Sequence, residues 1–271
     1  MGLMCGRFAV TTDPALLAAK IHAIDEATGA PGGRGPNYNV APTSTVATVV
    51  SRHTEPGDQA TRRVRLMRWG LIPPWARTGV NGAPGTLINA RAERATTAPA
   101  FRSSAKSQRC LIPMDGYYEW RVNDASPGNA SRGNASRGNA SRGNASRGKK
   151  SRKTPFFMYR DDGESLFVAG LWTARQAEGD TAPLLSCAII TTDAPGSLGE
   201  IHHRMPLVVP ERDWDRWLDP DAPADERLLS SPPDVRGIRM REVSTLVNNV
   251  RNNGPELITP AEPQPEQVLL L

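Results

Sequence analysis

Four short stretches of this sequence set a polar or ionisable side chain inside an apolar frame. They read MCGRF (4–8), LINARAE (87–93), GYYEW (116–120) and IHHRMP (201–206). Together they supply a thiol, an amide, a carboxyl group and an imidazole, from Cys5, Asn89, Glu119 and His202. A nucleophile accompanied by groups that transfer protons is typical of covalent acid–base chemistry, so we take these four residues as candidate catalytic residues.

Cys5 follows Met4 directly, and its chemistry depends on which residue precedes it in the mature protein. If Met4 is the start and is removed, Cys5 carries an α-amine and a thiol on one carbon. An α-amine has a pKa of about 7.7–8.0, so part of it is neutral near pH 7. A neutral amine forms a Schiff base with an aldehyde, and the thiol can then close a thiazolidine ring. If Cys5 is internal, a small buried hydrophobe is the alternative.

The other three candidates each have a structural alternative. Asn89 would orient a substrate oxygen or the amine, or would bond to backbone at a strand end. Glu119 lies between two aromatic residues, and an inward orientation would raise its pKa towards neutrality and let it exchange protons with a carbonyl oxygen. An outward orientation would leave it in solvent. His202 and His203 face opposite ways on an extended chain, so at most one serves a given site.

Cationic and aromatic residues near these stretches could contact a nucleic acid. Arg91 shares a face with Asn89 if the segment is extended, and a guanidinium suits a phosphate. Arg204 is a second phosphate candidate. Trp75, in RWGLIPPWA, could stack on a base if it is exposed. The sequence has no paired Cys or His at zinc-ligand spacing and no phosphate-binding glycine loop, so we expect no metal and no cofactor.

The elements expected to position these residues are mostly strands. A helix is predicted within 12–27, capped by Asp13 and with Leu17, Ile21 and Ile24 on one face, and a late helix within 211–218. Strand-like runs lie at 44–51, 63–69, 110–114, 116–122, 155–160, 166–172, 184–192 and 238–243. We therefore predict an α+β fold: a single domain over 4–271 with a curled, mainly antiparallel, barrel-like β core and peripheral helices.

A four-copy NASRG repeat (129–148) interrupts the expected hairpin between 116–122 and 155–160. The surrounding segment 124–153 holds eight Lys and Arg against one Asp. The positive charge of this segment exceeds the formal net charge of +5 of the whole chain, so the rest of the chain is slightly acidic. Small polar residues cannot bury enough surface to offset their ordering entropy, so we expect a disordered, tolerated insertion. The alternative is a basic tether for nucleic acid.

The composition argues against a membrane protein and against a secreted, disulfide-linked one. No apolar run approaches the roughly 18–20 residues of a membrane span, and the first residues lack the pattern of a secretory signal. The three cysteines are far apart and odd in number, which argues against a disulfide framework. We expect a cytoplasmic monomer with no membrane partner.

In order along the chain, MCGRF, NYNVAPT, RWGLIPPWA, NARAE, GYYEW, IHHRMP and the closing VSTLVNNVRNNGPELI resemble the SRAP family, the SOS response-associated peptidases or abasic-site processing proteins. The resemblance spans nearly the whole chain and implies a single α+β domain around a barrel-like core. It implies binding of single-stranded DNA that holds an abasic site, at the nucleoid, and capture of the ring-opened sugar as a thiazolidine on Cys5.

The resemblance also implies residue roles. Asn89 would position the sugar, Glu119 would assist ring opening and proton transfer, and His202 would act as acid or base. DNA contacts would come from Arg7, Pro42, Trp69 or Trp75, and Arg91. Some lyase activity, by β-elimination from the Schiff base, would accompany the cross-link.

The sequence departs from the family pattern in the repeat and in residues 1–3, an extension that is non-native or removed. Either Met4 is the true start or the chain clips itself before Cys5. Three other functions remain open. Cys5 could serve an N-terminal-nucleophile amidohydrolase or a thiol peptidase with His202, or the chain could be a non-enzymatic single-stranded DNA binder.

Overall fold

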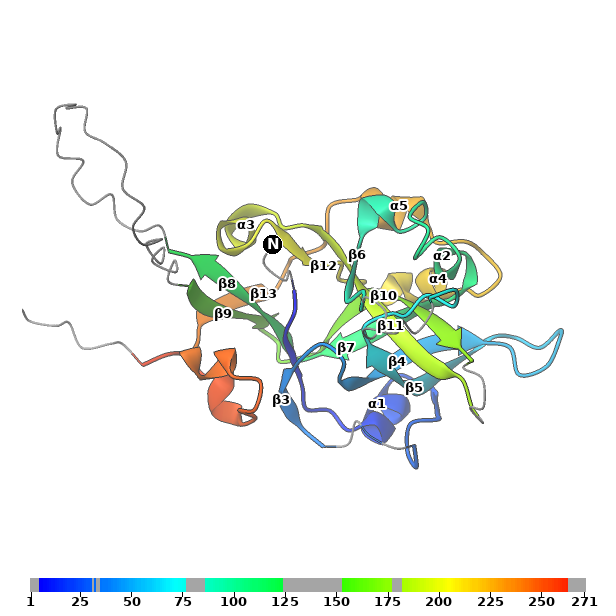
Figure 1. Ribbon diagram of the computed structural model, residues 1–271, viewed down its shortest axis with the longest axis horizontal. Helices are drawn as coiled ribbons and strands as arrows, with labels where there is room; N and C mark the ends of the chain where they lie inside the picture. The colour runs from blue at the N-terminus through cyan, green and yellow to red at the C-terminus, as the bar shows by residue number, and fades with distance from the viewer. Residues whose placement is uncertain are drawn as a thin grey trace, which may run out of the picture.

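The computed structural model describes residues 5–30, 32, 35–76, 86–123, 153–176 and 182–262. Strands hold more of these residues than helices do, and the helices are few and short (Figure 1). The predicted α+β class is confirmed. The expected insert and the first four residues lie outside the described residues, except that Lys153 opens a strand.

The larger sheet curls back on itself. Its strands run in the order β12, β11, β10, β7, β4, β5, β2, and β6 pairs separately with β11. A parallel pairing of β5 with β11 closes the ring through only two residue pairs, Arg68 with Ser186 and Trp69 with Cys187. The core is therefore a curled sheet joined at one corner rather than a regular barrel. The strands are β2 (Ile24–Asp25), β4 (Thr45–Arg52), β5 (Thr61–Trp69), β6 (Asn89–Arg91), β7 (Arg109–Met114), β10 (Leu166–Arg175), β11 (Leu184–Asp193) and β12 (Arg204–Pro206).

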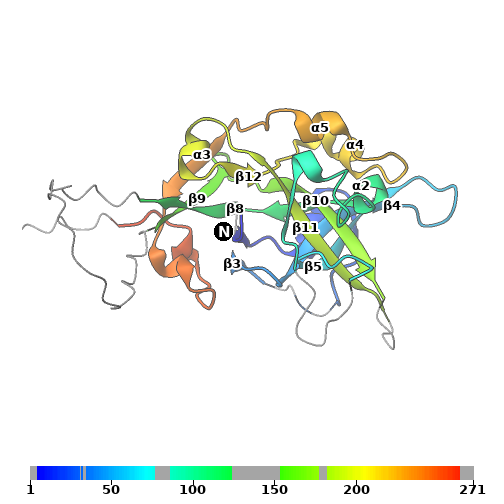
Figure 2. The ribbon, with the colours of Figure 1, turned by 45° about the horizontal axis from the view of Figure 1, so that its top comes forward.

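The smaller sheet is antiparallel throughout and holds the N-terminal strand. The predicted hairpin is present, with Tyr118 opposite Phe157 and Val122 opposite Lys153. Figure 2 shows this sheet beside the larger one. In order across the sheet its strands are β13 (Ile238–Glu242), β9 (Lys153–Arg160), β8 (Gly116–Val122), β1 (Phe8–Val10) and β3 (Asn37–Val40).

The interior between the two sheets contains large aromatic side chains. Trp69 is fully buried, its ring centroid lies 5.0 Å from that of Phe8, and its Nε1 donates to the carbonyl of Ile88 at 3.0 Å. Because Phe8 belongs to the smaller sheet and Trp69 to the larger, this contact helps to fix the start of β1 against the core.

The first helix is shorter than its pattern predicts. Asp13 caps α1 (Pro14–Lys20), accepting from the N–H of Ala15 at 2.8 Å. The helix ends at Ile21 because His22 has a φ of 53°, and Ile24 then joins β2 beside β5 with 46% of its surface exposed. The expectation that Ile24 lies on the buried face of this helix is wrong, since pairing with β5 redirects the chain.

The remaining helices are short and peripheral. They are α2 (Ser104–Ser107), α3 (Gly196–Ile201), α4 (Trp214–Leu218), α5 (Glu226–Ser230) and the 3-10 turns η1 (Ala92–Arg94), η2 (Glu211–Asp213), η3 (Thr245–Asn248) and η4 (Pro255–Leu257). The predicted late helix corresponds to η2 and α4. In the described part of the chain, none of the helices has the length and apolar character needed to traverse a lipid bilayer. All three cysteines are free and buried.

Candidate functional site

Cys5 lies just before β1, between β8 of the smaller sheet and β12 of the larger one. Its backbone nitrogen donates to Oε1 of Glu119 at 2.5 Å, and its Sγ lies 3.8 Å from the carbonyl oxygen of Arg204. Only 2% of the residue is exposed. The nitrogen and the sulfur of one residue are thus both held in a buried polar setting.

Glu119 reaches this nitrogen because β1 and β8 pair in one register. Phe8 lies opposite Tyr117, and the N–H of Tyr118 donates to the carbonyl of Arg7 at 3.0 Å. The Glu119 side chain points inward and is 2% exposed. Burial raises its pKa to about 7, against hydrogen bonds from Cys5 that lower it. A carboxyl group with this pKa can give or take a proton near neutral pH.

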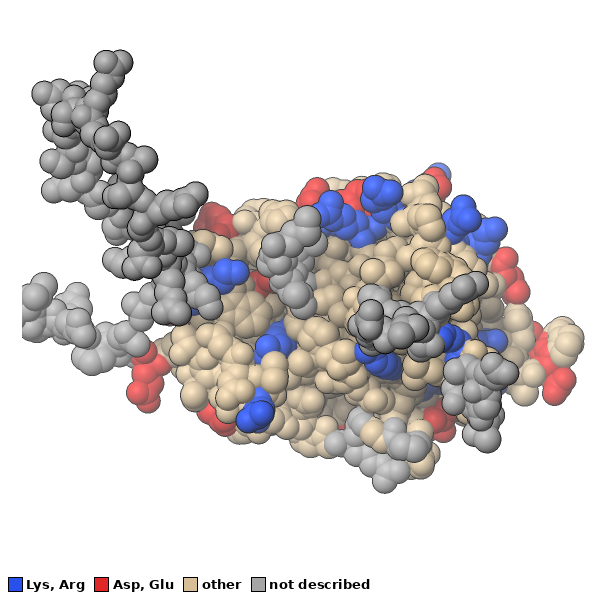
Figure 3. Space-filling view, viewed as in Figure 1, with Lys and Arg blue, Asp and Glu red and all other residues tan. Residues whose placement is uncertain are grey.

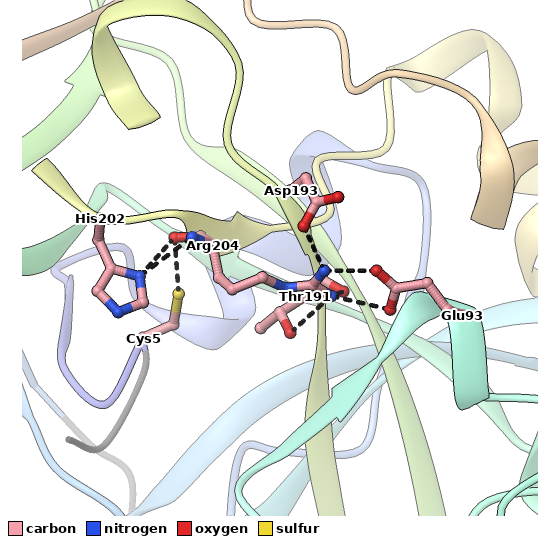
Figure 4. A network of polar contacts seen from close by, with 6 residues as sticks. All are labelled: Cys5, Glu93, Thr191, Asp193, His202 and Arg204. Atoms are coloured by element: carbon pink, nitrogen blue, oxygen red, sulfur yellow. Dashed lines mark hydrogen bonds and ion pairs between the residues drawn. The ribbon is translucent and has the colours of Figure 1, made fainter. Parts of the chain in front are cut away.

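His202 follows α3 and shares a partner with Cys5 (Figure 4). The N–H of Arg204 donates to Nδ1 of His202 at 3.1 Å. Burial lowers the pKa of His202, which keeps the imidazole neutral at pH 7. The carbonyl oxygen of Arg204, which lies near Sγ of Cys5, is also 3.2 Å from this Nδ1. The thiol of Cys5 and the ring of His202 thus share one neighbouring atom.

The thiol of Cys5 is protonated in this setting. Burial raises its pKa well above the usual value, and the charge of Glu119 raises it further. The sulfur is therefore held as a neutral thiol rather than as the nucleophilic thiolate.

The surroundings of Arg204 do not fit the phosphate contact that the sequence predicted for it. Its side chain is 5% exposed and its Nη1 forms ion pairs with Glu93 and, at 2.7 Å, with Asp193 (Figure 4). Its Nη2 also donates to the carbonyl of Thr191 at 2.5 Å. A guanidinium enclosed in this way joins η1, β11 and β12 rather than meeting a phosphate. Glu93 was part of the LINARAE motif, but no role was predicted for it, since its partner lies 111 residues away.

The two tryptophans proposed for base stacking occupy different environments. Trp69 is wholly buried in the core, so the stacking role is wrong for it. Trp75 is 68% exposed. Pro42 is half-buried after β3, and the N–H of the next residue, Thr43, donates to the carbonyl of Trp69 at 2.8 Å.

The remaining predicted residues lie on β6 and ahead of β1. Asn89 is half-buried at the start of β6, opposite Ile189, and Arg91 is exposed at its end, opposite Thr191. Arg7 is half-buried, and its Nη1 donates to Oδ1 of Asn39 at 2.6 Å and to the carbonyl of Val247 at 2.9 Å. Arg7 thus already has internal partners, whereas Arg91 is turned to solvent.

Two further observations bear on ligands. Across the residues that the structure describes, no three His, Cys, Asp or Glu side chains cluster as metal ligands would. In the space-filling view, Lys and Arg are scattered over the middle of one face and Asp and Glu lie mostly towards its rim (Figure 3).

The chain is similar in sequence to proteins of bacteria and mammals. It is 32% identical over 258 residues to the abasic site processing protein YoqW of Bacillus subtilis (strain 168), covering 94% of this chain and 99% of that protein. It is 30% identical over 239 residues to the abasic site processing protein HMCES of Mus musculus, covering 84% of this chain and 65% of that protein.

Solved structures share the fold. A crystal structure of a protein from Bacteroides thetaiotaomicron matches with a TM-score of 0.69 at 20% identity, over 95% of this chain and all of that one. One from Bordetella bronchiseptica matches with a TM-score of 0.62 at 23% identity, over 89% of this chain and all of that one. Residues 4–250 match the family described as SOS response associated peptidase (SRAP). With nearly the whole chain covered, this protein belongs to the SRAP family.

Proposed function

We propose that this protein processes abasic sites in single-stranded DNA by capturing them covalently on Cys5. The observation that carries the proposal is the 2.5 Å contact between the nitrogen of Cys5 and the carboxyl group of Glu119. In the chain as given this nitrogen is an amide joined to Met4. Once Cys5 is the first residue, the same atom is an α-amine beside a buried acid. The names of the relatives, abasic site processing proteins, support the choice of substrate.

Glu119 would regulate the protonation of the amine. With a pKa of about 7, its carboxylate can accept the proton of an ammonium group and leave a neutral, nucleophilic amine. The same proton is then available for the oxygen that leaves the sugar carbon. One residue can therefore act as base and then as acid.

The bonds form in two stages. An abasic sugar is in equilibrium with an open aldehyde, and the neutral amine adds to that carbon and expels water to form an imine. The Sγ of Cys5 then bonds to the imine carbon while its proton passes to nitrogen, which closes a five-membered thiazolidine. An imine that is not closed can lose the 3′ phosphate by β-elimination, so we expect lyase activity as a minor outcome. His202, whose ring lies near the same Arg204 carbonyl as the thiol, would transfer protons in the second stage.

The DNA would bind along the face that carries the exposed candidates. Of the candidate contacts, Arg91 and Trp75 are exposed, while Arg7 and Pro42 are half-buried. A guanidinium would contact phosphate, and an indole would stack on a base. Asn89, at the other end of β6 from Arg91, would orient the sugar. We expect the protein to act as a monomer.

Self-cleavage before Cys5 is a second candidate activity, because the backbone there is strained. Cys5 has a φ of 42°, which a non-glycine residue rarely adopts. This angle exists only while Met4 is attached, so cleavage of that peptide bond releases the strain. When a water molecule adds to the carbonyl carbon of Met4, the nitrogen regains its lone pair, and a protonated Glu119 can supply the proton that the departing amine needs while Met4 leaves with a carboxylate.

The test is denaturing electrophoresis of protein mixed with single-stranded DNA that carries one abasic site. Protein expressed from Met4 is compared with protein expressed from Met1, and intact mass establishes which residue is first. We expect a heat-stable shifted band only when Cys5 is the first residue. The Cys5→Ser variant keeps the amine but closes a weaker ring, so it should convert stable cross-link into strand cleavage.

The outcomes separate the competing functions. A verified Cys5 terminus that gives no band would overturn the proposal and favour amide or peptide substrates. A Cys5→Ser variant that performs like wild type in every DNA assay would identify a plain DNA binder. Conversion of the Met1 form to the Cys5 form in wild type but not in Glu119→Gln would support self-cleavage.

A further inference from the structure

Tyr117 presents a buried polar group that the site described so far does not use. The residue is 2% exposed, and its hydroxyl finds no hydrogen-bond partner among the described residues. Leaving a buried hydroxyl unpaired lowers stability, and phenylalanine would fill the same space without that loss. Since no described residue accepts from this hydroxyl, it is open to an acceptor on a bound substrate.

The strand register places Tyr117 close to the reactive residue. Tyr117 and Glu119 are two apart on β8, so their side chains lie on the same face of the strand. Tyr117 is also opposite Phe8 on β1, three residues after Cys5. The charges of Cys5 and Glu119 both act on its hydroxyl, and together with burial, which is the largest cause, they raise the pKa of Tyr117 well above its usual value. The group is a neutral hydrogen-bond donor throughout the physiological range.

The next residue provides a contrast on the opposite face of the strand. The hydroxyl of Tyr118 donates to the carbonyl of Tyr38 at 2.7 Å, and the residue is fully buried. One of these adjacent phenols therefore ties two strands of the smaller sheet together. The other lies on the face of β8 that carries Glu119 and has no hydrogen-bond partner among the described residues.

We propose that Tyr117 is a further catalytic residue, whose hydroxyl donates a hydrogen bond to the oxygen of the aldehyde that Cys5 attacks. This inference rests on the proposed function. As the amine nitrogen bonds to the aldehyde carbon, the electron pair of the C=O bond moves to oxygen, where the Tyr117 hydroxyl stabilises it. The phenol keeps its own proton. One proton from the nitrogen, passed through Glu119, converts this oxygen to a hydroxyl. The second nitrogen proton, passed through Glu119 in the same way, lets the oxygen leave as water and leaves the neutral imine.

The test compares Tyr117→Phe with Tyr118→Phe as a matched control. Each variant loses one buried hydroxyl and no carbon atoms. Single-turnover cross-linking to abasic single-stranded DNA should slow by about tenfold or more in Tyr117→Phe, because a donor to a developing oxyanion is lost. The melting temperature of this variant should stay the same or rise. Tyr118→Phe should show the reverse, with a lower melting temperature and an unchanged rate.

A second measurement shows which atom the hydroxyl serves. Iodoacetamide alkylates Sγ of Cys5 by displacement at a saturated carbon, with no oxyanion to stabilise, and its rate is followed by peptide mass. We expect equal alkylation rates in wild type and Tyr117→Phe. Alkylation that slows as much as cross-linking would overturn the assignment, because the hydroxyl would then act on the thiol. A wild-type cross-linking rate in Tyr117→Phe would also overturn it. No cross-link from wild type with a verified Cys5 terminus would instead overturn the proposed function.

Discussion

The nitrogen of Cys5 and Oε1 of Glu119 lie 2.5 Å apart, although 114 residues separate them in the sequence. The pairing of β1 with β8 is what brings them together. Because the contact is buried, the carboxyl group has little water to stabilise its charge, and its main polar partner is the atom proposed to react. The protonation of Glu119 is therefore coupled to folding and, under the proposed function, to catalysis.

The unfolding free energy of the protein should depend on pH because of this buried acid. Burial raises the pKa of Glu119 to about 7 in the folded state, while an unfolded glutamate titrates near its model value of 4.5. The folded state then holds a proton that the unfolded state releases, so this group stabilises the fold most below pH 4.5 and the effect is lost as pH rises through 7. Between pH 5 and pH 8, wild type should lose about 2 to 3 kcal/mol of unfolding free energy relative to Glu119→Gln.

Urea unfolding of both proteins at several pH values measures this difference. Groups other than Glu119 are shared by the two proteins and cancel in the comparison. Parallel stability curves across this range would show that Glu119 titrates normally in the folded protein and is not the neutral-pH acid of the site.

Local sequence patterns predicted the strands well, and the reason is physical. The runs at 44–51, 110–114, 166–172 and 184–192 are mostly apolar, those at 44–51 and 184–192 are also rich in β-branched residues, and the four runs form β4, β7, β10 and β11. Strands buried on both sides leave that pattern whatever their neighbours are. The hairpin of β8 and β9 was likewise predicted across a long insertion, since both of its strands are distinct in sequence.

Features set by distant partners could not be predicted. Arg204 resembles a surface arginine in sequence, and only the fold brings Glu93 and Asp193 to it. Trp69 and Trp75 sit in one motif, yet β5 buries the first and ends before the second. The early end of α1 depends on pairing of β2 with β5, which helical periodicity does not contain.

The ion pairs of Arg204 should contribute far more to stability than a surface pair. Arg204→Met removes a guanidinium that is 5% exposed and leaves the carbonyl of Thr191 without its donor. We expect a loss of about 2–4 kcal/mol of unfolding free energy, below the highest values for buried pairs because Glu93 and Asp193 still reach water. The matched control is Arg160→Met, whose partner Asp162 is 44% exposed, and which should cost less than about 1 kcal/mol. Chemical denaturation of both variants decides the point, and equal losses would contradict the internal role of Arg204.

The two tryptophans of the RWGLIPPWA motif should separate stability from DNA binding. Trp75→Ala removes an exposed indole, so it should leave the melting temperature unchanged and weaken binding to single-stranded DNA by about 1–3 kcal/mol. Trp69→Ala opens the core beside Phe8 and should cost about 3–5 kcal/mol of unfolding free energy. Fluorescence anisotropy with a labelled strand that carries a non-reactive abasic analogue measures binding without cross-linking. Full affinity in Trp75→Ala would exclude base stacking at this residue.

Substitutions of Arg91 and Arg7 should differ in their effects on DNA affinity, on its salt dependence and on the melting temperature. Arg91 is exposed at the end of β6, so Arg91→Gln should lower the slope of log affinity against log salt concentration by about 0.7, the value for one phosphate contact on a single strand, without lowering the melting temperature. Arg7→Gln also loses the hydrogen bonds to Asn39 and to the carbonyl of Val247 that tie β1 to β3 and η3. It should therefore lower the melting temperature as well as the affinity.

Anisotropy titrations over a series of salt concentrations, paired with thermal melts, test both variants. An unchanged slope in Arg91→Gln would remove Arg91 from the DNA-contacting surface, whereas an unchanged melting temperature in Arg7→Gln would mean that its internal hydrogen bonds do not hold the sheet edge.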